Sequence, residues 1–213
     1  MNQLNYHFLR VIFALPILVF TACTSLSSHN WQALNGQVLD DSKSDAISDA
    51  MVVALWQGTA KMQGQDHKVC YHVEVAKSDP KGHFTIPAWQ ENNNYPNVAN
   101  KSSSLIVYKA GYWSESVVQD WPVQLKKDWT LQKDIKFYLD PISEKNQQTD
   151  SKNRLKYLQK TIGLTGCTLD PLGKKRMSML YTAVLKEAKN VAITDMDHKI
   201  VQSIDNWTSF VSQ

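Results

Sequence analysis

Residues 69–89, VCYHVEVAKSDPKGHFTIPAW, show the clearest strand pattern of this chain. Apolar and polar residues alternate on both sides of the tetrapeptide DPKG at 79–82, and this alternation is typical of half-buried β-strands. Proline at the second position and glycine at the fourth favour a type I turn. The segment therefore predicts two antiparallel strands joined by a tight turn, with Val75 opposite Ile86 and Val73 opposite Ala88.

The alternation also divides the side chains of this hairpin between two faces, because residues two apart in a strand point to the same side. The apolar face, predicted to line the core, holds Val69, Tyr71, Val73, Val75 and Phe84. The other face holds Cys70, His72, Glu74 and Trp89. Cys70 is therefore predicted to point away from the core, where another layer has to cover it.

Similar runs continue in both directions, and seven of them lie between Leu34 and Pro141: NGQVLD, AMVVALWQ, KVCYHVEVAK, GHFTIPAW, SLIVYKAGYW, ESVVQDW and KDIKFYLD. Short strands at such close spacing indicate a sandwich or a barrel. After residue 150 the pattern changes to helical spacing, in RLKYLQKTIGL and in PLGKKRMSMLYTAVLKEAKNV. A weaker pattern over 200–211 suggests a third helix. The prediction is a mainly β chain with two or three helices packed on one sheet.

Three pieces of the β region together resemble a known family. LNGQVLDDSKSDAISDAMVVAL has a Gly-x-Val strand leading into an Ala-x-Val strand, SDPKGHFTIP has an Asp-x-x-Gly-x-Phe hairpin, and LIVYKAGYWS ends in Gly-Tyr. In this order they resemble the carboxypeptidase regulatory-like domains, although SKSDAIS replaces the usual Thr-Gly after the first strand. The resemblance implies a seven-stranded prealbumin-like (transthyretin-like) β-sandwich over 34–141, followed by a helical extension over 142–213.

The amino terminus predicts export. The unbroken apolar run VIFALPILVF at 11–20 is too short to span a bilayer, and small residues follow it, as in a secretory signal peptide. The junction VFTACTS resembles a bacterial lipobox, with Phe20 where an aliphatic residue is usual. This resemblance implies a signal peptide over 1–22, a diacylated Cys23 as the new amino terminus, and a lipidated tether over 23–33. Thr24, where an Asp would imply inner-membrane retention, implies the outer membrane. The alternative is an ordinary signal peptide that leaves a cysteine nearby.

The chain has three cysteines, so a lipid on Cys23 leaves Cys70 and Cys167 as an even pair in an oxidising compartment. Their disulfide would close a loop of about 100 residues, worth about 4 to 5 kcal/mol in the chain-entropy model. It would fasten the helical segment to the outward face of the hairpin. The alternative is two separate buried thiols.

Composition and missing motifs exclude several classes. The net charge of +3 gives no reason to expect nucleic acid as a partner. The chain lacks a Gly-x-Ser-x-Gly elbow, a phosphate-binding glycine loop and the His-x-x-Glu pair of metallocarboxypeptidases. It also lacks the Tyr-Arg-Gly-Ser terminus of the transthyretin-like hydrolases. The prediction is a protein that is not an enzyme and has no cofactor.

The candidates for chemistry are few. His72 and Glu74 share a strand face and form a weak ligand or metal candidate, but the sequence places no third ligand, so no metal is predicted. TDMDHK at 194–199 has carboxylates but not the pattern of a calcium loop, and helix capping explains it better. Sugar stacking on Trp113, Trp121 or Trp129 is an alternative to their usual place in or beside a core.

These observations predict a non-catalytic envelope lipoprotein that presents a β-sandwich for binding or scaffolding. It is expected on the periplasmic face of the outer membrane, with exposure on the cell surface left open. The expected partners are the membrane, through the amino-terminal lipid, and an unknown envelope protein or glycan. The alternative is a periplasmic hydrolase with an unrecognised site around His72 and Glu74.

Overall fold

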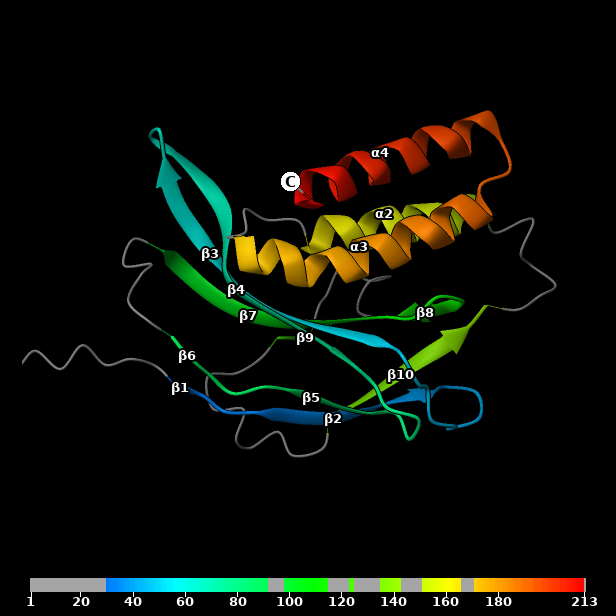
Figure 1. Ribbon diagram of the computed structural model, residues 1–213, viewed down its shortest axis with the longest axis horizontal. Coiled ribbons are helices and arrows are strands. Elements are labelled where there is room, and N and C mark those ends of the chain that lie inside the picture. The colour runs from blue at the N-terminus through cyan, green and yellow to red at the C-terminus, as the bar shows by residue number, and fades with distance from the viewer. Residues whose placement is uncertain are drawn as a thin grey trace, which may run out of the picture.

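The computed structural model describes residues 30–91, 98–114, 123–124, 135–142, 151–165 and 171–212. The chain is mainly β with three helices, and the described elements stack in layers, with two facing sheets and the helices above one of them (Figure 1). The predictions that concern residues 1–29, Cys167, Trp121 and Trp129 lie outside the described residues.

Two four-stranded sheets carry most of the strands. Sheet I has the order β5-β2-β10-β8, and sheet II has the order β4-β3-β7-β9. The strands of sheet I are β5 (His83–Ile86), β2 (Leu34–Asp40), β10 (Ile135–Pro141) and β8 (Tyr112–Ser114). Those of sheet II are β4 (Gln65–Lys77), β3 (Met51–Met62), β7 (Ala99–Tyr108) and β9 (Val123–Gln124). β2 and β10 pair in parallel, and the other described pairs are antiparallel.

A short ribbon of β1 (Asn30–Trp31) and β6 (Trp89–Gln90) completes the ten strands of the described residues. The sequence predicted seven, of which the run ESVVQDW at 115–121 lies outside the described residues. Two expected runs are split. Pro87 separates β5 from β6, because proline has no N–H for a ladder. A turn at Gly111, whose φ is +80°, separates β7 from β8. Asn30 and Trp31, expected in the tether, instead form β1.

The predicted pairing within residues 69–89 is wrong. The tight turn forms, since the Gly82 N–H donates to the Asp79 carbonyl at 2.8 Å. However, β4 pairs with β3 in sheet II, while β5 pairs with β2 in sheet I. The chain changes sheet at buried Ser78, whose N–H donates to the Ala50 carbonyl and whose hydroxyl donates to that of Ile47. The turn is thus a corner between the two sheets.

The predicted division of faces is also partly wrong, because β4 contains a bulge. His72 lies opposite Trp56 but Cys70 lies opposite Gln57, so Tyr71 is the extra residue. Cys70 lies away from the sandwich core, as expected, but Val73 and Val75 share its side. One extra residue reverses which face each later side chain occupies.

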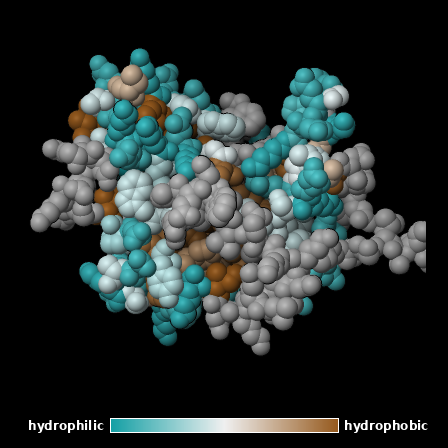
Figure 2. All heavy atoms as spheres, turned by 180° about the vertical axis from the view of Figure 1, so that it is seen from behind, coloured by the Kyte–Doolittle hydropathy of each residue, from teal (hydrophilic) through white to brown (hydrophobic). Residues whose placement is uncertain are grey.

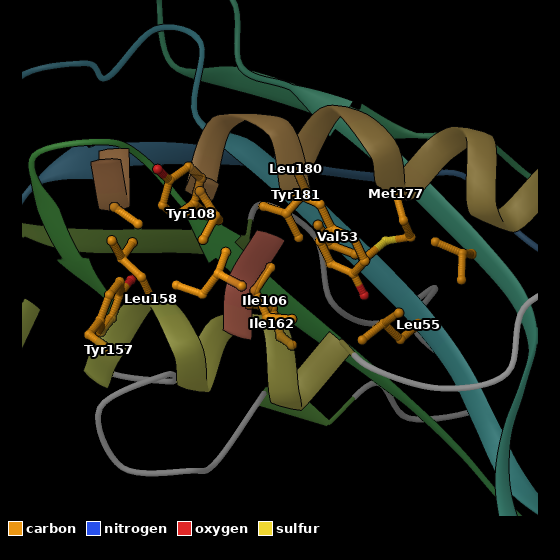
Figure 3. Close-up of a cluster of buried hydrophobic side chains, with 14 of the residues drawn as sticks. Val53, Leu55, Ile106, Tyr108, Tyr157, Leu158, Ile162, Met177, Leu180 and Tyr181 are labelled. Carbon is orange, nitrogen blue, oxygen red and sulfur yellow. The ribbon is translucent and has the colours of Figure 1, made fainter. Parts of the chain in front are cut away.

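Sheet II is buried on both faces, and this explains its unbroken apolar runs. Between the sheets lies a core that includes Val38, Val52, Ala54, Trp56, Phe84, Ile86, Leu105, Val107 and Leu139. A second core lies between sheet II and the helices, which are α2 (Ser151–Thr165), α3 (Pro171–Val191) and α4 (Asp195–Ser212). Figure 3 shows side chains of sheet II, α2 and α3 pointing towards one another in this second core. Sheet II therefore contributes side chains to both cores, one with sheet I and one with the helices.

β3 and β4 continue past the rest of sheet II as a two-stranded arm. β7 pairs with β3 only as far as Thr59, whereas β3 and β4 pair as far as Met62 and Gln65. The arm turns at Gln63 and Gly64, both with positive φ, as in the two-residue hairpin turns that match strand twist. It projects from the molecule in Figure 1 and is mainly hydrophilic at the upper right of Figure 2.

The motif at 194–199 is a helix cap, as expected. The Asp197 carboxylate accepts hydrogen bonds from the N–H groups of Thr194 and Ile193, and the Asp197 N–H donates to the Thr194 hydroxyl. These two N–H donors hold the pKa of Asp197 below its usual value of 3.8. The reciprocal bonds satisfy amide groups that have no partner within the helix at the start of α4.

Replacing Asp197 with Ala should lower the melting temperature at neutral pH. A carboxyl group whose pKa is lower in the folded state stabilises the fold above its unfolded pKa. This contribution disappears as the pH falls through the folded-state value, which lies below 3.8. The melting temperatures of the two proteins should thus converge on acidification, and a gap that stays constant down to pH 3 would contradict this role of Asp197.

Candidate functional site

The structure brings His72 and Glu74 together on β4, the edge strand of sheet II. The His72 Nε2 and Glu74 Oε1 atoms are 3.0 Å apart, and the two side chains are 18% and 11% exposed. Both follow the bulge at Tyr71 and lie on the face directed towards sheet I, opposite Trp56 and Ala54. The prediction that these two residues are neighbours is confirmed, but they do not share a face with Cys70.

The third member of this group is a cation. Arg176 of α3 places its Nη1 atom 2.9 Å from the same Glu74 Oε1 and donates to the Val73 carbonyl at 2.7 Å. The guanidinium group of Arg176 therefore reaches from the helical layer to the edge strand. There it forms an ion pair with Glu74 and a hydrogen bond with one backbone carbonyl. The positive charge of Arg176, next to the Glu74 carboxylate, opposes the binding of a metal cation there. Across the described residues, no three His, Cys, Asp or Glu side chains are grouped to hold a metal ion.

Aromatic rings enclose the pair. Trp89 stacks on the His72 imidazole, with centroids 3.8 Å apart and planes 15° apart, and Trp56 meets His72 edge-on at 5.1 Å. Trp31 lies opposite Trp89 in the β1–β6 ribbon, and their rings are parallel within 3°. Trp89 of the ribbon and Trp56 of β3 thus both contact His72, and Trp31 packs against these two tryptophans. This packing orients the imidazole and shields it from solvent.

A second polar group lies between the helices and sheet II. The Arg154 side chain on α2 donates from Nε and Nη2 to Glu187 on α3, at 2.8 to 3.0 Å, and from Nη1 to the Tyr112 carbonyl at 2.6 Å. Glu187 also accepts from the Tyr108 hydroxyl at 2.7 Å and from the Gly111 N–H at 3.1 Å. The two charged side chains are 3% and 10% exposed. This network joins two helices to the turn between β7 and β8.

Aromatic rings complete the second group. The Arg154 guanidinium lies 4.4 Å from the ring centre of Tyr157 and 4.9 Å from that of Trp113. Burial, with the nearby Glu187 carboxylate, raises the pKa of Tyr108, so its hydroxyl remains a donor. Trp113, one of the sugar-stacking candidates, is half-buried here against Tyr157 and Arg154.

The sequence did not identify either set of partners. Arg154 and Arg176 are the two arginines that follow residue 22, and each binds a glutamate more than 30 positions away. The small number of arginines was a signal in the sequence that could have identified them as partners of buried carboxylates, because guanidinium groups are suited to buried ion pairs. Trp31 lay in a segment that resembled a tether.

Cys70 lies in the core between sheet II and the helices, together with Leu180, Tyr181 and Val184 of α3. Its expected partner, Cys167, is outside the described residues, between the last residue of α2 and the first of α3. The helices on either side of position 167 cover the face on which Cys70 lies. The disulfide stays a prediction, with this placement in its favour.

Comparison with known proteins finds no match. No family model, no curated protein and no solved structure matches this chain. Within the described part of the chain, no helix is long and apolar enough to cross a membrane.

Proposed function

We propose that this protein is a non-catalytic envelope lipoprotein, held at the outer membrane by lipid on Cys23, that presents a prealbumin-like β-sandwich for binding or scaffolding. The observation that carries the non-catalytic part is the contact between Arg176 and Glu74. It completes a closed group of His72, Glu74 and Arg176 beneath Trp89, with distances of 2.9 and 3.0 Å. Both contacts are made to the same Glu74 oxygen, Oε1, and the imidazole of His72 is covered by Trp89, a pattern typical of a structural ion pair.

The order of the strands supports the proposed fold. β2 to β5 and β7 follow one another along the runs that resemble the carboxypeptidase regulatory-like pattern, and they divide between two facing sheets. β2 and β10, the first and last strands of sheet I along the chain, pair in parallel in the middle of that sheet. Among the described elements, the helices lie over sheet II, and none lies over the outer face of sheet I (Figure 1). This arrangement suits a protein that presents a sheet surface to a partner.

The membrane part of the proposal is tested by replacing Cys23 with Ser. The variant should move from the membrane fraction to the soluble periplasmic fraction, or accumulate with its signal peptide, because the acyl chains anchor the wild-type protein. Cell fractionation followed by immunoblotting measures this. Cys70→Ser is the matched control and should stay in the membrane fraction; identical fractionation and mass of Cys23→Ser and wild type would refute the anchor.

The non-catalytic part is tested at His72 and Glu74. Hydrolase activity of the purified protein on ester and peptide substrates, lost in both His72→Gln and Glu74→Gln, would establish the alternative hydrolase. The proposal expects no turnover by the wild-type protein that either variant abolishes, and no bound transition metal by elemental analysis.

A further inference from the structure

Sheet I contains a hollow of about 390 Å³. The outer face of this sheet lies on the side away from the helices (Figure 1). The lining of the hollow comes from three neighbouring strands, β5, β2 and β10: Asn35, Gly36, Gln37, His83, Phe84, Thr85, Ile135 and Lys136. The volume lies within the range of ordinary small-molecule sites.

The strand register groups the polar side chains of this hollow into two rows. Gln37 lies between His83 on one side and Lys136 on the other, and Asn35 lies opposite Thr85. Asn35 and Gln37 are two residues apart on β2, so both rows are on one face. The five side chains therefore form one contiguous polar patch.

Several polar atoms of this patch are available to a ligand. The Thr85 hydroxyl donates to Asn35 Oδ1 at 2.7 Å, which leaves the two N–H donors of the Asn35 amide. Gln37 donates from Nε2 to the Lys81 carbonyl at 2.9 Å, which leaves its Oε1 as an acceptor. In the part of the chain that the structure describes, Lys136 makes no ion pair.

The Asp79 carboxylate, beside His83, is engaged in the turn at 79–82. Asp79 Oδ2 lies 3.9 Å from His83 Nδ1, and its Oδ1 accepts the N–H groups of Lys81 and His83 at 2.8 Å. Lys136, on the opposite side of the row from His83 and Asp79, supplies a cation that suits an anionic group at that end of the hollow.

We propose that this hollow binds an acidic saccharide, with a sugar carboxylate at Lys136 and sugar hydroxyl groups at Asn35, Gln37, His83 and Thr85. Amide and hydroxyl side chains both donate and accept hydrogen bonds, as sugar hydroxyl groups do. A polar outer face is ordinary for a solvated sheet, but here five polar side chains surround a hollow. Phe84 and Ile135 border it from the strand backbone, because their side chains pack in the core between the sheets. This inference rests on the proposed binding function and names the class of its partner.

The test measures binding to the mature full-length protein in detergent micelles by titration calorimetry. The probes are trigalacturonic acid, neutral maltotriose and the tripeptide Glu-Glu-Glu. Trigalacturonic acid should bind at least fivefold more tightly than maltotriose, and Lys136→Gln should weaken its binding about fivefold by removing a charge-assisted contact. Asn35→Ala should weaken both saccharides. Lys152→Gln, an exposed lysine on α2, is the control and should bind as the wild type does.

Three outcomes overturn the inference: no binding of trigalacturonic acid at millimolar concentration, equal binding by Lys136→Gln, or binding of the tripeptide as tight as that of the acidic saccharide. Circular dichroism confirms that each variant is folded. Because binding is measured in micelles, it does not depend on the anchor. If the protein carries lipid but binds no saccharide, only the proposed saccharide site is refuted. If it carries no lipid but binds the acidic saccharide, only the proposed lipid anchor is refuted.

Discussion

Replacing Glu187 with Leu is expected to lower the free energy of unfolding by about 3 to 5 kcal/mol, because it leaves the Arg154 guanidinium buried without its counter-ion. Arg154 is 2% exposed and donates three hydrogen bonds to Glu187. The same substitution removes the acceptor of the Tyr108 hydroxyl. Unfolding in urea, followed by circular dichroism, measures the loss.

Two further variants separate the buried pair from a general effect on α3. Lys186→Met changes an exposed neighbour and should alter stability by no more than about 0.5 kcal/mol. The double variant Arg154→Met with Glu187→Leu should recover part of the loss, because no charge is then left unpaired. If Glu187→Leu is as stable as Lys186→Met, the network does not join the helices to the sheet.

Replacing both Cys70 and Cys167 with Ser is expected to loosen the helical layer while most of the β signal is retained. The chain-entropy model gives the proposed disulfide about 4 to 5 kcal/mol for a loop of about 100 residues. The sandwich has its own core between the sheets, whereas Cys70 lies in the core shared with the helices. The loss should therefore appear first as proteolysis after Pro141.

Limited proteolysis with mass mapping, in parallel with far-ultraviolet circular dichroism, measures both effects. Cys23→Ser in detergent is the control for the loss of a cysteine outside the pair. Non-reducing peptide mapping of the wild type should yield one peptide pair that contains Cys70 and Cys167. Two free thiols in protein isolated from the periplasm would refute the disulfide.

Much of the architecture follows from local patterns. The alternation in β4 and β5, the apolar runs of β3 and β7, and the stripe of Met177, Leu180, Val184 and Ala188 on α3 each identify their element. The cap of α4 was recognisable because Thr194 and Asp197 have the spacing that reciprocal capping needs. These features depend on residues close together in the sequence.

What the sequence did not indicate depends on contacts between distant residues. The turn at 79–82 is compatible with a hairpin or with a corner between sheets, and the choice is made by hydrogen bonds from Ser78 to the distant residues Ile47 and Ala50. The bulge at Tyr71 appears only when β4 is aligned with β3. For the same reason, His72 and Glu74 were recognisable as neighbours, whereas Arg176, 102 residues further along the chain, was not.

The mass of the intact protein tests the central claim, that the chain is a lipoprotein anchored through Cys23, most directly. The protein is extracted from outer membranes in detergent and measured by mass spectrometry, with the amino-terminal peptide sequenced. The account predicts a chain that begins at Cys23 and carries the mass of a diacylglyceryl group and an amide-linked acyl chain. A chain that begins at another residue, or that begins at Cys23 without added lipid, would contradict it.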